Sequence, residues 1–413
     1  MKADKNNLSS KQRSSLEKKY KGKIVEELEL GPYISYKSNK DIPFLHVYRF
    51  EEAFSFRLIW EILNRFKANK DDYVFDPFCG SGTTLFTSFV KGIPSVGTDT
   101  LPLALFVSET LPQFLFLEKG EITNVWKKLL FEIDSCHPAS VAADVPIMKV
   151  AFNKDILLKL RKMKTAIENL PARYTDIFLF LFFSILEECS LTVKENRYPK
   201  VVEKKSSDPF DAMKERIRTV EENITVKRYQ LNRENLPEVF SADTRELLLP
   251  FKKKPTILIT SPPYADQIDY TQSYALELCF HFVENVQEFN NLRERFLRSY
   301  TGPVMKEESP HPAVEEVVSA LKNSDSGIPE MVNAYFVDMK RVIKEWYSTL
   351  SKNARIAVIV DNLIYHGEII PADLILSDMA GEIGFATERI VVAKYKKNLD
   401  NIPVRESVIM WKQ

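Results

Sequence analysis

Residues 72–92 read DYVFDPFCGSGTTLFTSFVKG and predict a strand, a glycine-rich turn and a helix in direct succession. Tyr73, Val74 and Phe75 favour a buried strand, because aromatic and β-branched residues fit a pleated, buried surface. Gly80 and Gly82 follow, and glycine takes positive φ without steric cost and lets a ligand approach the backbone. The helix beyond them leaves free N–H groups at its start. Open α/β sheets bind nucleotide-like ligands at this place.

The residues around this turn are therefore candidate ligand contacts, and a plain structural glycine turn is the alternative. A triphosphate site is disfavoured, because no Gly-Lys-Ser/Thr follows the glycines. The spacing also differs from the GxGxxG pattern of dinucleotide-binding folds. The candidate contacts are Asp76, Pro77, Phe78, Gly80, Ser81, Gly82, Thr83 and Thr84.

Short apolar, β-branched runs predict six further strands. They are PSVGTD (94–99), EVFSADT (238–244), TILITS (256–261), RIAVIVDN (355–362), RIVVAKYK (389–396) and ESVIMWK (406–412). Their alternation with helical segments predicts an α/β fold, with a mostly parallel seven-stranded sheet covered on both faces. The closely spaced C-terminal strands predict one antiparallel strand at an edge.

The composition excludes several classes of protein. In 413 residues, 57 basic side chains balance 57 acidic ones, so a dedicated non-specific nucleic-acid binder is disfavoured. The four cysteines lack CxxC spacing, which favours neither a zinc ribbon nor a disulfide framework and suits a reducing cytoplasm. The first residues show no signal peptide, and the longest apolar run, at 177–186, is too short for a bilayer and predicts a buried helix. We expect a cytoplasmic protein without bound metal and without membrane contact.

Acidic residues end two of the predicted strands. Asp99 lies about 20 residues after the glycine turn, where an acid in nucleotide-binding sheets accepts hydrogen bonds from ribose hydroxyls. Asp243 ends another strand and could reach an adenine amino group. Each has an alternative role as a helix N-cap, which Asp performs well.

A second unusual stretch is ILITSPPYADQIDY at 257–270. Its two prolines fix two φ angles and remove two backbone donors at the end of a central strand. The Ser261 hydroxyl and the Pro262 carbonyl can both accept hydrogen bonds, and the Tyr264 ring can stack. This set suits a planar ligand with an exocyclic NH₂ group, and a purely structural proline corner is the alternative. The predicted catalytic corner is Ser261, Pro262, Pro263 and Tyr264.

DPFCGSGTT followed by TSPPY resembles the S-adenosylmethionine-dependent DNA amino-methyltransferases, which modify cytosine N4 or adenine N6. The resemblance implies a Rossmann-like methyltransferase fold, a cofactor site at the glycine loop and a corner that holds a flipped base. It also implies that the segment SNKDIPFLHVYRFEEAFSFRLI closes over the bound cofactor. Phe54 and Ser55 of this segment are then expected near the methionine end of S-adenosylmethionine. In the resembled family, a corner that begins with Ser instead of Asp favours cytosine N4 as the methylated atom. The implied partners are double-stranded DNA and a cognate restriction endonuclease.

Three rival functions stay open on the sequence alone. They are adenine N6 methylation of DNA, methylation of an RNA amino group, and a non-catalytic subunit that binds nucleic acid.

Two basic clusters are candidates for DNA contacts, and a solvated charged surface is the alternative for each. The first holds Arg293, Arg295, Arg298 and Lys306, and the second holds Lys194, Arg197 and Lys200. Residues around 199–210 are expected to form a mobile loop.

The resemblance divides the chain into six parts. The first three are an N-terminal arm (1–25), a cofactor-binding part (26–119) and a helical insertion (120–235), which is interpreted as a DNA-contacting region. The last three are a catalytic part (236–289), a target-recognition segment (290–330) and the C-terminal part of the methyltransferase domain (331–413).

Overall fold

The computed structural model describes residues 10–50, 53–195, 198–224, 231–301, 307–322, 327–397 and 402–413. Its centre is an eight-stranded sheet in the order β1-β11-β12-β8-β7-β2-β3-β6. The strands are β1 (Ile24–Glu26), β2 (Val74–Asp76), β3 (Ser95–Asp99), β6 (Glu238–Ser241), β7 (Ile257–Thr260), β8 (Arg355–Asp361), β11 (Ala386–Lys397) and β12 (Pro403–Lys412). The mostly parallel, Rossmann-like α/β architecture is confirmed.

Two details of the sheet go beyond the sequence expectation. Strand β1, from the expected N-terminal arm, adds an eighth strand parallel to β11. The antiparallel strand β12 lies inside the sheet, where it pairs with both β8 and β11. The chain passes from β8 through a helix to β11, which leaves one strand position open between them. The last strand then turns back from β11 and fills that position.

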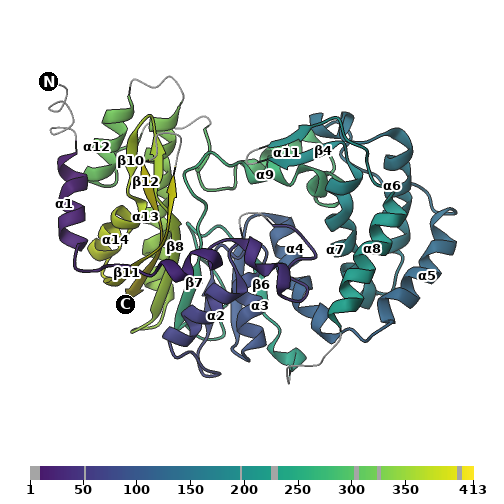
Figure 1. Cartoon of the computed structure of the whole chain (residues 1–413), viewed down its shortest axis with the longest axis horizontal. Coiled ribbons are helices and arrows are strands. Elements are labelled where there is room, and N and C mark those ends of the chain that lie inside the picture. Colours follow the sequence, from purple (N-terminus) through teal and green to yellow (C-terminus); the bar gives the residue numbers. More distant parts are fainter. Residues whose placement is uncertain are drawn as a thin grey trace.

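Helices cover both faces of the sheet (Figure 1). Ile356, Val358 and Val360 of β8 pack with one helical layer, while Ala357 and Ile359 pack with the other, as the period of two requires. The first layer contains α1 (Lys11–Tyr20), α12 (Pro312–Leu321), α13 (Ile328–Thr349) and α14 (Ala372–Ile383). The second layer contains α2 (Phe56–Arg65), which begins at an N-cap formed by Ser55.

Helix α1 is part of the folded body. Leu16 and Tyr20 are buried, and the Arg13 guanidinium pairs with Glu316 at 2.8 Å. The Tyr20 hydroxyl donates to Asp378 at 3.0 Å. The described part of residues 1–25 is therefore a packed helix followed by an edge strand.

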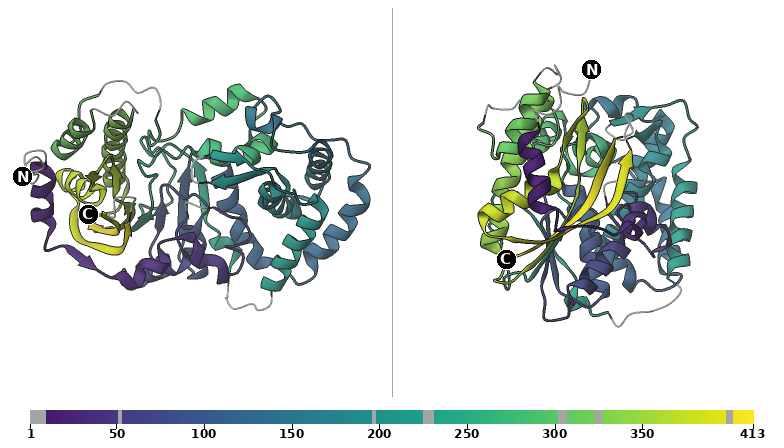
Figure 2. Two further views of the ribbon diagram at one scale, coloured as in Figure 1. Left: turned by 45° about the horizontal axis from the view of Figure 1, so that its top comes forward. Right: turned by 60° about the vertical axis from the view of Figure 1, so that its left-hand side comes forward.

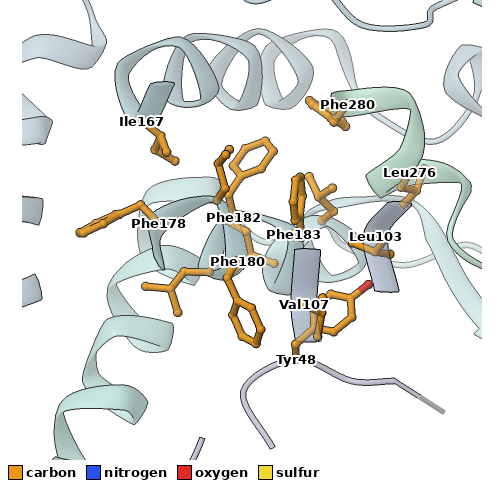
Figure 3. Packing of buried hydrophobic residues seen from close by; sticks show 14 of the residues in the cluster. Tyr48, Leu103, Val107, Ile167, Phe178, Phe180, Phe182, Phe183, Leu276 and Phe280 are labelled. Atoms are coloured by element: carbon orange, nitrogen blue, oxygen red, sulfur yellow. The ribbon is translucent and has the colours of Figure 1, made fainter. Parts of the chain in front are cut away.

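Residues 120–224 form a helical unit beside the sheet (Figures 1 and 2). Its helices are α5 (Glu121–Ile133), α6 (Lys154–Glu168), α7 (Ala172–Cys189) and α8 (Pro209–Asn223). Helix α7 carries the apolar run at its centre, and Phe178, Phe180, Phe182 and Phe183 are almost fully buried there. Figure 3 shows the Phe182 and Phe183 rings on the side of α7 that faces Leu103 and Phe280, while the Phe178 ring points the other way. The predicted buried helix is confirmed, and in the described part of the chain no helix is both long and apolar enough to cross a membrane.

A β-hairpin interrupts this helical unit. Strands β4 (Thr192–Glu195) and β5 (Tyr198–Val201) are antiparallel. The expected loop at 199–210 therefore starts within a strand and ends at the first turn of α8. Asp208 caps α8 by accepting a hydrogen bond from the Phe210 N–H at 2.9 Å.

The remaining helices connect the sheet to the helical unit. They are α3 (Thr83–Val90), α4 (Pro102–Thr110), α9 (Tyr270–Ser273), α10 (Ala275–Glu277) and α11 (Val286–Arg293). Residues of α3, α4 and α10 share one buried apolar cluster with α7. Single-turn elements and the β9–β10 hairpin (Leu363–Tyr365 and Glu368–Ile370) complete the fold.

Candidate active site

A cavity of about 490 Å³ lies at the carboxyl ends of β2, β3, β7 and β8. Its volume falls within the roughly 300–1,000 Å³ typical of small-molecule sites. The glycine turn and the proline corner, about 180 residues apart in sequence, both line it. Among the predicted site residues, the cavity is lined by Phe54, Phe78, Gly80, Ser81, Thr83, Asp99, Asp243, Ser261, Pro262, Pro263, Tyr264 and Arg295.

The glycine turn is held by hydrogen bonds to β3 and to the segment that follows β6. The Cys79 N–H donates to the carbonyl of Thr98 on β3 at 2.9 Å. The Pro77 carbonyl accepts from the hydroxyls of Thr98 and Thr244, at 3.0 and 2.8 Å. Gly82 has φ of 76°, and a Cβ there would lie 2.9 Å from the Ser108 Cα. Glycine is therefore required at this position both for its conformation and for space.

Asp99 ends β3 and joins the turn to the next helix. Its Oδ2 accepts from the Gly80 N–H at 3.0 Å, and its Oδ1 accepts from the Leu101 N–H at 2.9 Å. Each carboxylate oxygen keeps a second acceptor position, so Asp99 can still receive hydrogen bonds from a ligand. Burial raises its pKa from the ordinary value. Its predicted alternative as a helix cap is partly realised, since it binds the N–H just before α4.

Asp76 connects the turn to the strand that leads into the corner. It is fully buried, and its Oδ1 accepts from the Thr260 hydroxyl at 2.6 Å and from the Phe78 N–H at 3.2 Å. Burial raises the pKa of its carboxyl to about 6. Asp76 is one of five predicted cofactor residues that do not line the cavity: Ser55, Asp76, Pro77, Gly82 and Thr84.

The proline corner follows β7 directly. The Ser261 and Tyr264 hydroxyls lie 3.1 Å apart, close enough for one to donate to the other. Burial raises the pKa of Tyr264 well above its usual range, and the carboxylates of Glu406 and Asp361 add to this effect. The Ala265 carbonyl accepts from the Tyr365 hydroxyl at 2.6 Å, which secures the chain after the corner.

A residue that sequence reasoning missed holds the segment around Phe54. Asn39 is buried, and its side chain donates to the Phe54 carbonyl at 3.1 Å and accepts from the Phe56 N–H at 2.9 Å. Phe54 lines the cavity, whereas Ser55 is fully buried and caps α2 through the Leu58 N–H. No residue spacing in the sequence indicates the role of Asn39.

Asp243 lies on the cavity wall in an ion pair with Arg245, at 2.6 Å. Its alternative role as a helix cap is wrong, because residues 242–251 form turns without a helix. Its Oδ1 instead accepts from the Arg245 N–H within such a turn.

Of the seven predicted DNA-contacting residues the structure describes five, and three of these form ion pairs with buried acids. Arg298 binds the buried Asp338, Arg293 binds the buried Asp269, and Lys194 binds the buried Glu277 at 2.7 Å. These pairs hold segments of the protein together. Arg295 and Lys200 are exposed, while Arg197 and Lys306 lie outside the described residues.

The wall opposite the glycine turn holds four charged residues that were not predicted as site residues. They are Asp361, Lys394, Lys396 and Glu406, from β8, β11 and β12. A signal was available for Asp361, which ends its strand as Asp76 and Asp99 do. Glu406 lies at the same edge of the sheet because β12 runs antiparallel to β8. The direction of β12 is set by the tertiary structure and cannot be read from the sequence.

The chain is similar to type II methyltransferases. It is 28% identical to the Type II methyltransferase M.BsoBI of Geobacillus stearothermophilus, over 97% of this chain and 92% of that protein. It is 26% identical to the Type II methyltransferase M.AvaI of Nostoc sp., over 92% of this chain and 86% of that protein. No family model matches the chain. A solved rRNA methyltransferase, aviRa from Streptomyces viridochromogenes, aligns with a TM-score of 0.31 at 12% identity over 87% of this chain and 85% of that one, too distant to bear on function.

The residues of the cavity fit S-adenosylmethionine, the cofactor that the motif resemblance implies. Asp99 offers carboxylate acceptors for ribose hydroxyls, and the turn at Gly80 and Ser81 exposes backbone on the cavity wall. The apolar side chains of Phe54, Phe78 and Leu101 supply surface for a flat ring and for the carbon chain of the cofactor.

Proposed function

We propose that this protein is a site-specific DNA methyltransferase that transfers a methyl group from S-adenosylmethionine to the exocyclic amine of a flipped cytosine, at N4. One observation carries the proposal: the glycine turn and the Ser-Pro-Pro-Tyr corner line one cavity. Similarity to two type II methyltransferases over more than nine-tenths of the chain supports the same function. The type II name also supports a restriction-modification setting, with a cognate endonuclease as partner.

The chain contributes binding and positioning in this mechanism. When bound, S-adenosylmethionine supplies a methyl group on a positively charged sulfur. Asp99 would hold the ribose, and the turn from Phe78 to Thr83 would accommodate the rest of the cofactor. The Ser261 hydroxyl and the Pro262 carbonyl would accept the two amine hydrogens and so orient the nitrogen lone pair for methyl transfer. The Tyr264 ring stacks on the base after it leaves the helix.

The choice of cytosine over adenine rests on Ser261. The hydroxyl of Ser261 replaces the carboxylate that leads the corner in related enzymes of the resembled family. Adenine N6 is the second candidate, because the corner offers the same two acceptors to either amine. The product nucleoside distinguishes them.

The test is nucleoside mass spectrometry of DNA from cells that express the wild-type chain or a corner variant. Wild type is expected to produce N4-methylcytosine, and Pro262→Ala is expected to lose it. Pro312→Ala, at an exposed proline that begins α12, is the matched control and should retain the product. N6-methyladenine would change the base and keep the mechanism. Methylation of RNA but not of DNA would contradict the proposal that DNA is the substrate.

A cofactor-binding measurement separates an enzyme from a non-catalytic subunit. Titration calorimetry with S-adenosylmethionine should show one site, and Asp99→Ala should weaken it. Absence of binding in wild type would contradict the proposal.

A further inference from the structure

Two carboxylates face each other across the strands on the cavity wall. Asp361 of β8 and Glu406 of β12 are direct partners in the antiparallel pair, so their side chains lie on the same face of the sheet. Lys396 bridges them, with its Nζ 2.6 Å from Asp361 Oδ2 and 3.2 Å from Glu406 Oε1. Lys394 lies 4.0 Å from the other oxygen of Glu406.

Each carboxylate leaves one oxygen without a hydrogen-bond partner. Among the residues that the structure describes, Asp361 Oδ1 and Glu406 Oε2 are buried and accept no hydrogen bond. The two residues are only 9% and 6% exposed, and both line the cavity. Burying a charged oxygen without a partner costs free energy, which a fold tolerates mainly where the oxygen has a use. The unused acceptors therefore point to an interaction with what enters the cavity.

The proposed reaction requires an acceptor of this kind. The amine nitrogen forms a bond to the methyl carbon, the carbon–sulfur bond breaks, and its electron pair stays on sulfur. The nitrogen is then positively charged and must give up one proton to regain neutrality. The Ser261 hydroxyl and the Pro262 carbonyl are neutral oxygens, and both are too weakly basic to keep that proton.

Resting on the proposed function, we infer that the carboxylate of Asp361 accepts the proton that the methylated amine releases. Lys396 and Glu406 are positioning residues that hold this carboxylate at the cavity wall. The base of this active site thus comes from β8, outside the Ser-Pro-Pro-Tyr corner, and compensates for the absence of a carboxylate within it.

The charges around Asp361 suit this role. Burial raises its pKa to about 6, Lys396 and Lys394 on β11 lower it, and Glu406 on β12 raises it. Tyr264 of the corner stays neutral there, since its own pKa is raised. Asp361 is therefore ionised at neutral pH and binds a proton more tightly than an ordinary carboxylate does.

The experiment measures single-turnover methyl transfer to duplex DNA between about pH 5 and pH 8, with S-adenosylmethionine binding measured in parallel. The wild-type rate is expected to fall as the pH drops through about 6. Asp361→Asn is expected to lower the rate about 100-fold or more and to remove that pH dependence, with cofactor affinity unchanged. Lys396→Met removes a positive charge beside Asp361 and is expected to shift the midpoint of the profile to higher pH.

Asp373→Asn is the matched control. Asp373 is a fully buried carboxylate paired with Arg405 at 2.8 Å, and it does not line the cavity. It is expected to lower thermal stability and to leave the pH profile unchanged. The inference would be overturned if Asp361→Asn transferred methyl groups at the wild-type rate, or if Lys396→Met kept the wild-type midpoint of the pH–rate profile. The proposed methyltransferase function would stand in either case. If wild type transfers no methyl group to DNA, the proposed function itself fails.

Discussion

Two carboxylates at strand ends, Asp99 and Asp361, define opposite walls of the cavity. Both oxygens of Asp99 accept hydrogen bonds from backbone N–H groups, at 3.0 and 2.9 Å. Asp361 binds one lysine side chain through Oδ2, and its Oδ1 has no partner in the described part of the chain. The first wall is fixed by backbone, whereas the second is built from side-chain charges with spare acceptor capacity.

This difference separates binding from chemistry within one site. A carboxylate held by two backbone groups keeps a constant geometry, which suits recognition of a cofactor. A carboxylate with an unpaired oxygen and a raised pKa is costly to the fold, which suits proton transfer. Substitutions on the two walls should therefore affect different quantities, namely cofactor affinity on one and reaction rate on the other.

The largest effect is expected at Gly82 on the cofactor wall. Gly82→Ala adds a Cβ that would lie 2.9 Å from Ser108 and forces alanine into positive φ, so S-adenosylmethionine affinity should fall by about 100-fold or more. Calorimetric titration measures this loss. Gly120→Ala is the control, because Gly120 has φ of 81° with open space around its Cβ position. Equal affinities in the two variants would show that the turn tolerates displacement.

A smaller effect is expected at Tyr264, on the opposite wall. Tyr264→Ala removes the stacking surface and should slow methyl transfer by about 10- to 100-fold, with cofactor affinity retained. Tyr264→Phe keeps the ring and loses only the contact with the Ser261 hydroxyl, so its loss should be smaller. Single-turnover kinetics distinguish the two variants. Identical losses would assign the effect to the hydroxyl and contradict stacking.

A gain in stability is expected from Asp361→Asn. The folded state raises the pKa of this carboxyl from 3.8 to about 6, so its ionised form destabilises the fold above that pH. The variant should be more stable than wild type by about 1–3 kcal/mol at pH 7.5, and this gain should disappear as the pH falls from about 6 to about 4. Thermal or urea unfolding at several pH values measures it. A loss of stability at pH 7.5 would mean that Asp361 serves the fold.

The smallest effect is expected at the rim, where Arg295 is exposed. Among the described hydrogen bonds, its side chain makes one, to the Ser241 hydroxyl at 3.4 Å. Arg295→Ala should weaken DNA binding. It should also lower the slope of the logarithm of the binding constant against the logarithm of salt concentration by about one. Arg298→Ala instead breaks the pair with the buried Asp338 and should lower stability. Binding isotherms at several salt concentrations test the first variant. An unchanged salt slope would remove Arg295 from the DNA contact.

The sequence was most informative where local chemistry and tertiary role coincide. The glycine turn, the proline corner and Asp99 were predictable, because each needs a particular backbone conformation or follows a strand end. Asn39, Lys396 and Glu406 were not predictable, because their roles depend on segments that are distant in the chain. For the basic cluster at Arg293 and Arg298, charge composition did not reveal that both side chains pair with buried acids.

The sequence by itself determined the alternation of strands and helices, the buried helix α7 and the two motifs that characterise the site. Apolar periodicity and glycine and proline conformations are local properties, and local properties can be read from neighbouring residues. Only the tertiary structure decided that β12 runs antiparallel between β8 and β11, which brings Glu406 opposite Asp361. Strand order and direction depend on which long-range pairing buries the most apolar surface, and that balance is a property of the whole chain.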